Sequence, residues 1–115
     1  MGYQWTRKAN FGGTARHFAV GVRLGNYGYI GTGKAAVYSY KDFWAYNPST
    51  NTWTQKADLS GGARWSAVGF SIGSKGYIGT GIGSGTYLHD FWEYNPSTNT
   101  WTQKADLSGG ARWSA

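Results

Sequence analysis

Residues 47–67 read NPSTNTWTQKADLSGGARWSA, and residues 95–115 repeat the same letters 48 positions later. The repetition begins earlier in the chain, because Trp5-Thr6-Arg7-Lys8-Ala9 corresponds to Trp53-Thr54-Gln55-Lys56-Ala57 at the same offset. Residues 5–67 and 53–115 are identical at 42 of 63 aligned positions. A fixed period of about 20–50 residues is typical of repeat architectures. We therefore interpret the chain as copies of one structural unit.

Composition limits the class of protein. The 115 residues are 40% hydrophobic and 18% aromatic, which is too apolar for a disordered chain, and 19 glycines indicate many tight turns. No run of about 18 apolar residues is present, so no membrane span is expected. Residues 1–10 lack an apolar core, so no export signal is expected in the chain as given, and the compartment stays open.

Alternating apolar residues predict short strands. Val20, Val22 and Leu24 share one face of the first of them. No segment shows a helical period, which predicts an all-β chain. The strands expected in the two units are 19–24, 27–32, 42–46 and 52–57, then 67–72, 76–80, 90–94 and 100–105. Residues 5–8 alternate in the same way and are expected to form the last strand of a preceding unit.

The connection between the second and third strands of each unit is expected to be a loop. Residues 34–41 and 82–89 occupy this position, and they differ at all eight places while the strands around them largely agree. A constant scaffold with a variable connection is the usual division between rigid elements and functional loops.

The unit resembles the kelch repeat. Six residues separate Tyr46 from Trp53 and Tyr94 from Trp101, and Gly31-Thr32-Gly33 stands near the position of the glycine pair of that repeat. The resemblance implies kelch-type β-propeller blades, each a four-stranded antiparallel sheet. The sequence of the repeat is most similar to bacterial kelch proteins. This resemblance would suit a secreted or cell-surface protein. Copies this similar indicate recent duplication or deliberate design.

The resemblance divides the chain into two blades with a partial repeat at each end. Residues 11–57 form blade 1 and 58–105 form blade 2. Residues 1–10 are the outer strand of a preceding blade, and 106–115 begin a third repeat. Stacked blades bury aromatic rows between them, which we favour over a ligand cage. The residues of this expected blade core are Trp44, Tyr46, Trp53, Trp92, Tyr94 and Trp101.

Catalytic and metal chemistry are not expected. The five carboxylates include Asp42/Asp90 and Asp58/Asp106, which are repeat equivalents one blade apart, so they are not predicted to form acid–base dyads. Two isolated histidines without cysteine make a poor metal site. Copper-oxidase relatives within the kelch family require a cysteine that is absent. We expect no enzyme, no cofactor and no metal.

The predicted binding residues lie in the connections. Arg16, Arg64 and Arg112 recur just before the first strand of each unit. The resemblance implies that these connections share one face with the variable loops. Arginine beside tyrosine and tryptophan is typical of binding hot spots. The alternative is that each arginine bonds neighbouring carbonyl groups and binds nothing. The expected face comprises Arg16, His17, Arg64, Trp65, Arg112, Trp113, Tyr38, Tyr40, Tyr87 and His89.

Two functions are kept open, and an enzyme fragment of the kelch oxidase or epimerase kind is a remote third. The first is a non-catalytic scaffold that self-associates, because a single chain would leave an apolar blade face at each end. Three chains would complete a six-bladed ring, and four chains an eight-bladed one. One position in the ring, from the last strand of one blade to the first strand of the next, could then be filled by either 101–115 of one chain or 5–19 of the next. The second is a module that binds an acidic peptide or glycan. The charge of +6 is scattered, so nucleic acid is not an expected partner.

Overall fold

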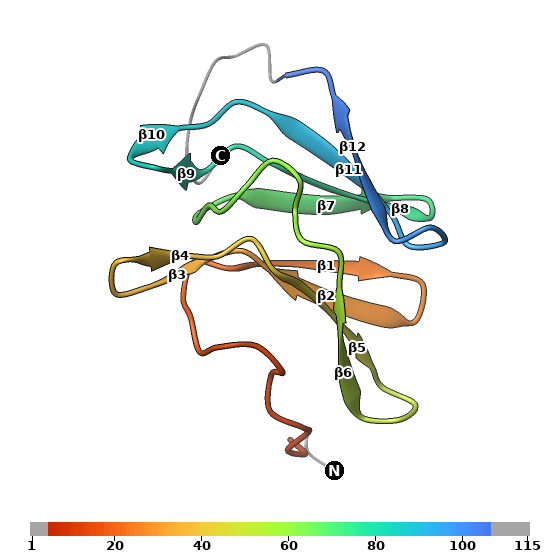
Figure 1. Cartoon of the computed structure of the whole chain (residues 1–115). Helices are drawn as coiled ribbons and strands as arrows, with labels where there is room; N and C mark the ends of the chain where they lie inside the picture. Colours follow the sequence, from red (N-terminus) through yellow and green to blue (C-terminus); the bar gives the residue numbers. More distant parts are fainter. Residues whose placement is uncertain (1–4, 107–115) are drawn as a thin grey trace.

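The computed structural model describes residues 5–106, which form two four-stranded antiparallel sheets, one per repeat (Figure 1). No helix occurs in this part of the chain, which confirms the all-β prediction. The first sheet has the order β1-β2-β5-β6 and the second has β7-β8-β11-β12. The strands of the first sheet are β1 (Val20–Leu24), β2 (Tyr27–Gly31), β5 (Phe43–Asn47) and β6 (Thr52–Lys56). Those of the second are β7 (Val68–Ile72), β8 (Lys75–Gly79), β11 (Phe91–Asn95) and β12 (Thr100–Lys104).

The sequence predicted that the connections at 33–41 and 81–89 are loops, and this prediction is wrong in one respect. Each contains a small hairpin, β3 (Lys34–Ala35) with β4 (Tyr38–Ser39), and β9 (Ile82–Gly83) with β10 (Thr86–Tyr87). Ser84 and Gly85 both have positive φ, 52° and 74°, which is the backbone of a two-residue turn that suits the twist of paired strands. Two-residue strands are too short to leave an alternating pattern, so periodicity could not find them.

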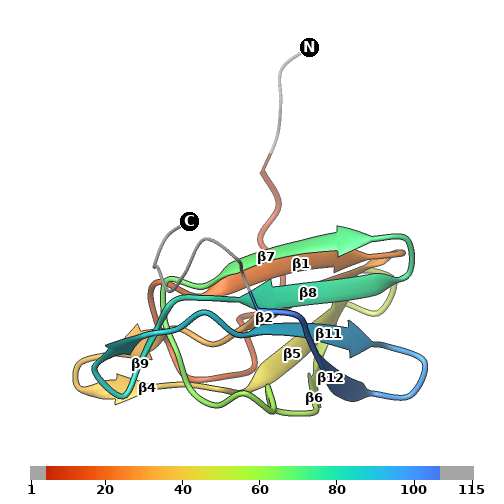
Figure 2. The same ribbon diagram turned by 90° about the horizontal axis from the view of Figure 1, so that it is seen from above.

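The two blades meet along their first strands, and β1 lies beside β7 (Figure 2). Glycines on blade 2 let the strands approach. A Cβ at Gly69 would lie 2.5 Å from Val20 Cγ2, and one at Gly76 would lie 3.3 Å from Leu24 Cδ1. We call this contact between the two sheets the internal junction. It buries the apolar face of β1 against the surface of β7 and β8.

Aromatic rings fill the rest of the internal junction. Phe43 of blade 1 lies 4.9 Å from both Tyr94 and Trp101 of blade 2, measured between ring centroids, and Tyr29 lies 5.7 Å from Tyr94. Tyr94 and Ile78 are fully buried there, and Trp92 packs at the edge of the same cluster. The second aromatic row therefore packs between blades.

The first aromatic row lies on the outer face of blade 1. Phe11 from the N-terminal segment contacts it, with ring centroids 5.9 Å from Trp44 and 5.1 Å from Trp53. Tyr46 packs on Trp53 at 5.0 Å. All three side chains of the row stay partly exposed, since no blade covers them in the described chain.

The N-terminal segment follows the same course on blade 1 as the blade-to-blade connection follows on blade 2. The Ala9 N–H donates to Asn51 Oδ1 at 2.9 Å, and the Ala57 N–H donates to Asn99 Oδ1 at the same distance. Residues 5–10 form no strand, because the described chain offers no neighbouring strand for them. Their assignment to a preceding blade stays a prediction. Residues 107–115 lie outside the described part.

Candidate binding face

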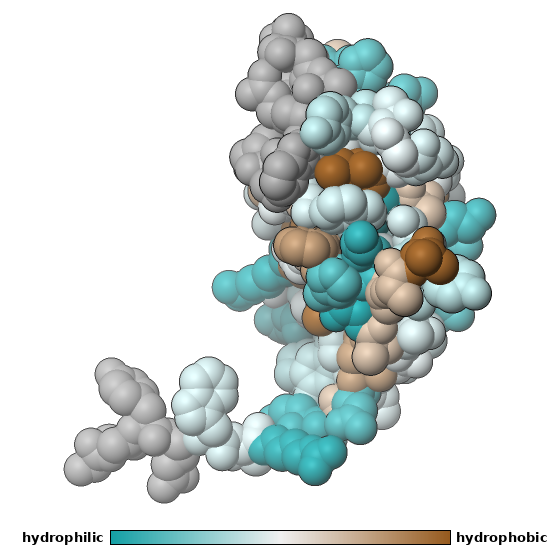
Figure 3. All heavy atoms as spheres, turned by 90° about the vertical axis from the view of Figure 1, so that its left-hand side faces the viewer, coloured by the Kyte–Doolittle hydropathy of each residue, from teal (hydrophilic) through white to brown (hydrophobic). Residues whose placement is uncertain are grey.

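The connections before each first strand and the two small hairpins gather at one end of the blades. We call this end the loop face; it comprises residues 11–18, 33–41, 57–66 and 81–89, and Figure 3 looks onto it. Backbone hydrogen bonds join its parts across the internal junction. The Gly33 N–H donates to Arg64 O at 2.8 Å, and the Arg64 N–H donates to Tyr40 O at 3.1 Å. The face is therefore a continuous, hydrogen-bonded surface.

Arg64 and Asp90 form a bidentate pair within blade 2. Nη1 and Nη2 of Arg64 donate to the two carboxylate oxygens of Asp90 at 2.7 and 2.8 Å, and Nη1 also donates to Thr80 O at 3.2 Å. The Trp92 Nε1–H donates to the same carboxylate at 2.7 Å. The arginine is fully buried. The pair ties the connection before the first strand to the start of the third.

The same pair occurs in blade 1, between Arg16 and Asp42. Nη2 of Arg16 donates to Asp42 Oδ2 at 2.8 Å, Nη1 donates to Oδ1, and Trp44 Nε1–H adds a third bond at 2.8 Å. The ring of Tyr40 lies 4.2 Å from the guanidinium carbon and covers it. Only 3% of the Arg16 side chain is exposed.

Both carboxylates are held in the ionised form. Burial by itself would raise the pKa of Asp90, but hydrogen bonds from Arg64 and Trp92 outweigh it and hold the pKa below its ordinary value. The pKa of Asp42 is lowered in the same way by Arg16 and Trp44. Arg16 and Arg64 therefore neutralise carboxylates of their own chain. This engagement favours the alternative in which the arginines bond within their own chain, and their role in a partner-binding face stays a prediction.

Aromatic and basic side chains gather on the loop face near the start of β1. Phe18 is half exposed and lies between two rings, 4.7 Å from His17 and 5.3 Å from Trp65. Lys34 Nζ lies 4.4 Å from the centroid of Trp65. This region contains His17 and Trp65, two residues of the predicted partner-binding face. The sequence analysis missed Phe18 and Lys34, because only the structure brings their segments together.

A groove of about 450 Å³ crosses the loop face between the two hairpins. Small side chains line most of it: Ser39, Gly61, Gly62, Ala63, Gly83, Ser84, Thr86 and Leu88. Tyr38 and Tyr87 are exposed and directly adjoin lining residues along the chain, Tyr38 next to Ser39 and Tyr87 between Thr86 and Leu88. The groove is uncharged, since neither arginine lines it.

The predicted histidines do not form a metal site. His89 Nε2 lies 3.4 Å from Asp106 Oδ2 at an exposed position, and His17 lies in the aromatic region of blade 1. Among residues 5–106, no three His, Cys, Asp or Glu side chains gather closely enough to hold a metal ion. Arg112 and Trp113 lie outside the described residues.

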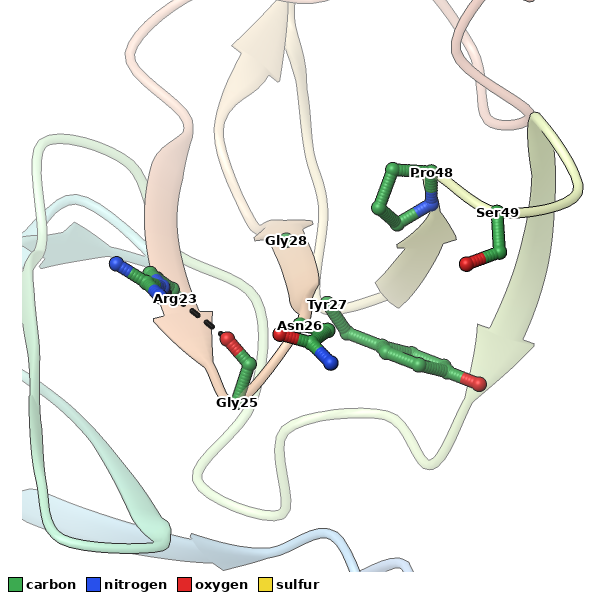
Figure 4. Close-up of a pocket in the computed structure, with 7 residues that line it drawn as sticks. All are labelled: Arg23, Gly25, Asn26, Tyr27, Gly28, Pro48 and Ser49. Carbon is green, nitrogen blue, oxygen red and sulfur yellow. Dashed lines mark hydrogen bonds between the residues drawn. The ribbon is translucent and has the colours of Figure 1, made fainter.

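The opposite end of blade 1 carries a second hollow, of about 600 Å³ (Figure 4). It lies among the turn between β1 and β2 and the turn between β5 and β6. Tyr27 extends away from Arg23 in this view, and Arg23 bends back so that its Nε donates to Gly25 O at 3.1 Å. Asn47 Nδ2 donates to the Tyr27 hydroxyl at 3.2 Å. The Arg23 guanidinium and the Tyr27 hydroxyl therefore both have partners within the blade.

The fold defines the class of protein. Two four-stranded antiparallel sheets, stacked along their first strands, are blades of a β-propeller. The chain superimposes on the structure of YjhT with a TM-score of 0.81 and 18% sequence identity, over 96% of this chain and 44% of that one. The chain thus spans less than half the length of that neighbour, and the likeness concerns the fold.

The second repeat is similar to a kelch repeat. Residues 76–108 match the family model for the Kelch motif, which confirms the resemblance in the second unit. The first unit shares its strand order and its arginine–aspartate pair. No curated protein matches the sequence. Kelch propeller blades support a general role as a binding or scaffold module. Over residues 5–106, the structure contains no helix long and apolar enough to cross a membrane.

Proposed function

We propose that this chain is a non-catalytic scaffold that self-associates, with blade 2 of one copy packing on blade 1 of the next. The observation that carries the proposal is that the two outer surfaces are repeat equivalents of the two sides of the internal junction. We call the outer surface of blade 2 the trailing face and that of blade 1 the leading face. The trailing face comprises Val68, Phe70, Ile72, Tyr77, Phe91 and Glu93. The leading face comprises Gly21, Gly28, Ile30, Trp44, Tyr46 and Trp53.

The trailing face exposes side chains that the internal junction would bury. Phe70 is 42% exposed, whereas its equivalent Val22 is 8% exposed. Ile72 is 64% exposed, whereas Leu24 is 6% exposed. Burying one large apolar side chain contributes about 1.5–3 kcal/mol. Several such side chains on two faces are needed to exceed an association cost of about 4–15 kcal/mol.

The leading face has space for those side chains above two of its glycines. At the internal junction, Val20 and Leu24 pack on Gly69 and Gly76. The equivalent glycines of blade 1 are open: nothing lies within 4 Å of a Cβ built at Gly28, and only Tyr29 O, at 3.7 Å, approaches one built at Gly21. Val68 and Ile72 of another copy are the equivalents of the side chains that would enter.

The contact is head to tail, so it closes into a ring or continues as a filament. Three copies give six blades and four copies give eight, and we propose the three-copy ring as the simplest closure. Strand β12 pairs with β11 of its own chain over Phe91–Asn95, so 100–104 already hold the outer position of blade 2. Deleting residues 1–10 is therefore expected to leave the assembly intact.

A substitution at Gly21 tests the contact. Gly21→Val places a β-branched side chain on an exposed strand position, where a single copy has room for it, but where Val68 of the next copy would collide with it. Thr54→Val is the matched control, because Thr54 is exposed in β6 and its equivalent position lies outside the internal junction. In light scattering, Gly21→Val is expected to be a folded monomer and Thr54→Val a ring. Assembly of both variants would contradict the proposed contact.

A second candidate function is glycan binding in the groove of the loop face. Two exposed tyrosines beside a groove of about 450 Å³ lined by small and hydroxyl side chains support an uncharged, hydroxyl-rich ligand. An acidic peptide has less support, because the arginines that would have bound it are engaged. Tyr87→Ala should abolish a signal on a glycan array without changing the melting temperature. A parent chain with no signal on that array would contradict this candidate.

A further inference from the structure

We propose that Glu93 sets the strength of the contact between copies, because its carboxylate enters that contact without gaining a partner. The inference rests on the proposed self-association and goes beyond it. It predicts that a ring has two kinds of junction, an apolar one inside each chain and a weaker, acid-strengthened one between chains.

The two blades differ at the position of Glu93, which corresponds to a packed position of the internal junction. Its repeat equivalent is Ala45, which is 2% exposed and belongs to the apolar cluster of the internal junction. Glu93 lies on the trailing face, and 19% of its side chain is exposed even with that face uncovered. A junction between copies would therefore place a carboxylate where the internal junction has a methyl group.

Within its own blade, Glu93 has two partners. The Tyr77 hydroxyl donates to Oε2 at 2.8 Å, and Lys104 Nζ lies 3.7 Å from Oε1. The ring of Tyr77 stacks on Phe91 and Phe70, each at 5.5 Å, so the hydroxyl is fixed by packing. The lysine is half exposed and approaches from β12. These groups hold the carboxylate in place on an apolar surface.

The leading face has no free donor to offer in return. Its three polar hydrogens already have acceptors in their own chain. Trp44 Nε1–H donates to Asp42 at 2.8 Å, the Tyr46 hydroxyl donates to Asn51 Oδ1 at 2.7 Å, and Trp53 Nε1–H donates to Ala9 O at 3.3 Å. The leading face, as defined above, contains no lysine or arginine. By repeat equivalence with Tyr94 and Trp101, the rings of Tyr46 and Trp53 are what would cover the region of Glu93.

A buried carboxylate that loses water and gains no partner opposes association, and protonation removes most of that opposition. The ionisable groups that face Glu93 are Tyr77 and Lys104 from its own sheet and, across the contact, Tyr46. Tyrosine and lysine side chains do not change charge between pH 7.5 and 5, so among the groups at this contact a response in that range belongs to the carboxylate.

The direction of the response follows. The contact excludes water from Glu93 and opposes its charged form, so the assembled form favours the protonated carboxylate. Assembly is therefore strengthened as the pH falls, and is weakest where the carboxylate is fully ionised.

The experiment compares Glu93→Gln and Glu93→Ala with the parent chain by sedimentation velocity over a dilution series at pH 7.5 and 5. We expect both variants to assemble at about tenfold lower protein concentration than the parent at pH 7.5. The parent should tighten at pH 5, and Glu93→Gln, which keeps the size of the side chain, should not respond to pH. Unchanged or weaker assembly of both variants would overturn the inference.

A second pair of variants tests the charge argument inside one chain. Ala45→Glu and Ala45→Gln put side chains of equal size into the internal junction, so the difference between their melting temperatures isolates the charge. Ala45→Glu should melt lower at pH 7.5 and approach Ala45→Gln at pH 5. If this pair behaves as expected but neither the parent nor any Glu93 variant assembles, the self-association proposal is wrong, and so is the proposed role of Glu93. If parent and variants assemble alike, the inference alone fails.

Discussion

Removing the Arg64 side chain should destabilise blade 2, because this residue is held inside the blade by its pair with Asp90. Arg64 is fully buried and donates two hydrogen bonds to Asp90 and one to Thr80 O. Breaking a buried ion pair by removing one member costs about 3–5 kcal/mol, since the other charge stays buried without its partner. Asp90 keeps its bond from Trp92, so we expect Arg64→Ala to lose about 3 kcal/mol of unfolding free energy.

The measurement is denaturant unfolding followed by tryptophan fluorescence, with Arg23→Ala as the control. Arg23 is exposed and forms no ion pair among residues 5–106, so its loss should change the stability by less than about 0.5 kcal/mol. A loss below about 1 kcal/mol for Arg64→Ala would refute the structural role.

The same pair predicts an acid dependence. The pKa of Asp90 is lower in the folded chain than its ordinary value, so the pair stabilises the fold fully above that ordinary pKa. This stabilisation is lost as the pH falls through the lower, folded-state pKa. Arg64→Ala should remove that part of the acid dependence, and an unchanged pH profile would argue that the pair does not perturb Asp90.

Three further predictions concern stability. Ile78→Ala should cost about 2–5 kcal/mol because Ile78 is fully buried in the internal junction, whereas Ile72→Ala on the trailing face should leave the melting temperature of a single copy nearly unchanged. Burial, together with the neighbouring Tyr29, raises the pKa of Tyr94 to about 12. The stabilisation from the neutral form of Tyr94 is therefore complete below pH 10 and is lost toward pH 12. Tyr94→Phe should reduce this loss of stability in melting temperatures measured at alkaline pH. Ala36→Gly should stabilise the β3–β4 hairpin by about 1 kcal/mol, because Ala36 has a φ of 53°, and a lower melting temperature would contradict that reasoning.

The strands and the blade order were predictable because they depend on a repeated local pattern. Val20, Val22 and Leu24 alternate, and the 48-residue offset set the register of the second blade from the first. The β3–β4 and β9–β10 hairpins were not predictable in this way, since two residues carry no period. Their pairing depends on turn geometry and on backbone contacts such as the one between His17 and Lys34.

The ion pairs of Arg16 and Arg64 were not predicted, because the sequence analysis noted which arginines recur but not what lies opposite them. A signal was available: Arg16 precedes Asp42 by 26 residues, and Arg64 precedes Asp90 by the same number. Such a repeated spacing between opposite charges indicates a pair inside each unit. Phe18 and Lys34 carry no such signal, and their neighbourhood depends on how the segments fold together.

The mass of the chain in solution tests the central claim most directly. Light scattering coupled to size exclusion should give three times the 12.6 kDa of one chain, as expected for a six-bladed ring in which every trailing face meets a leading face. A well-folded species of 12.6 kDa at every accessible concentration would contradict the claim, because it would show that the exposed Phe70 and Ile72 need no partner blade.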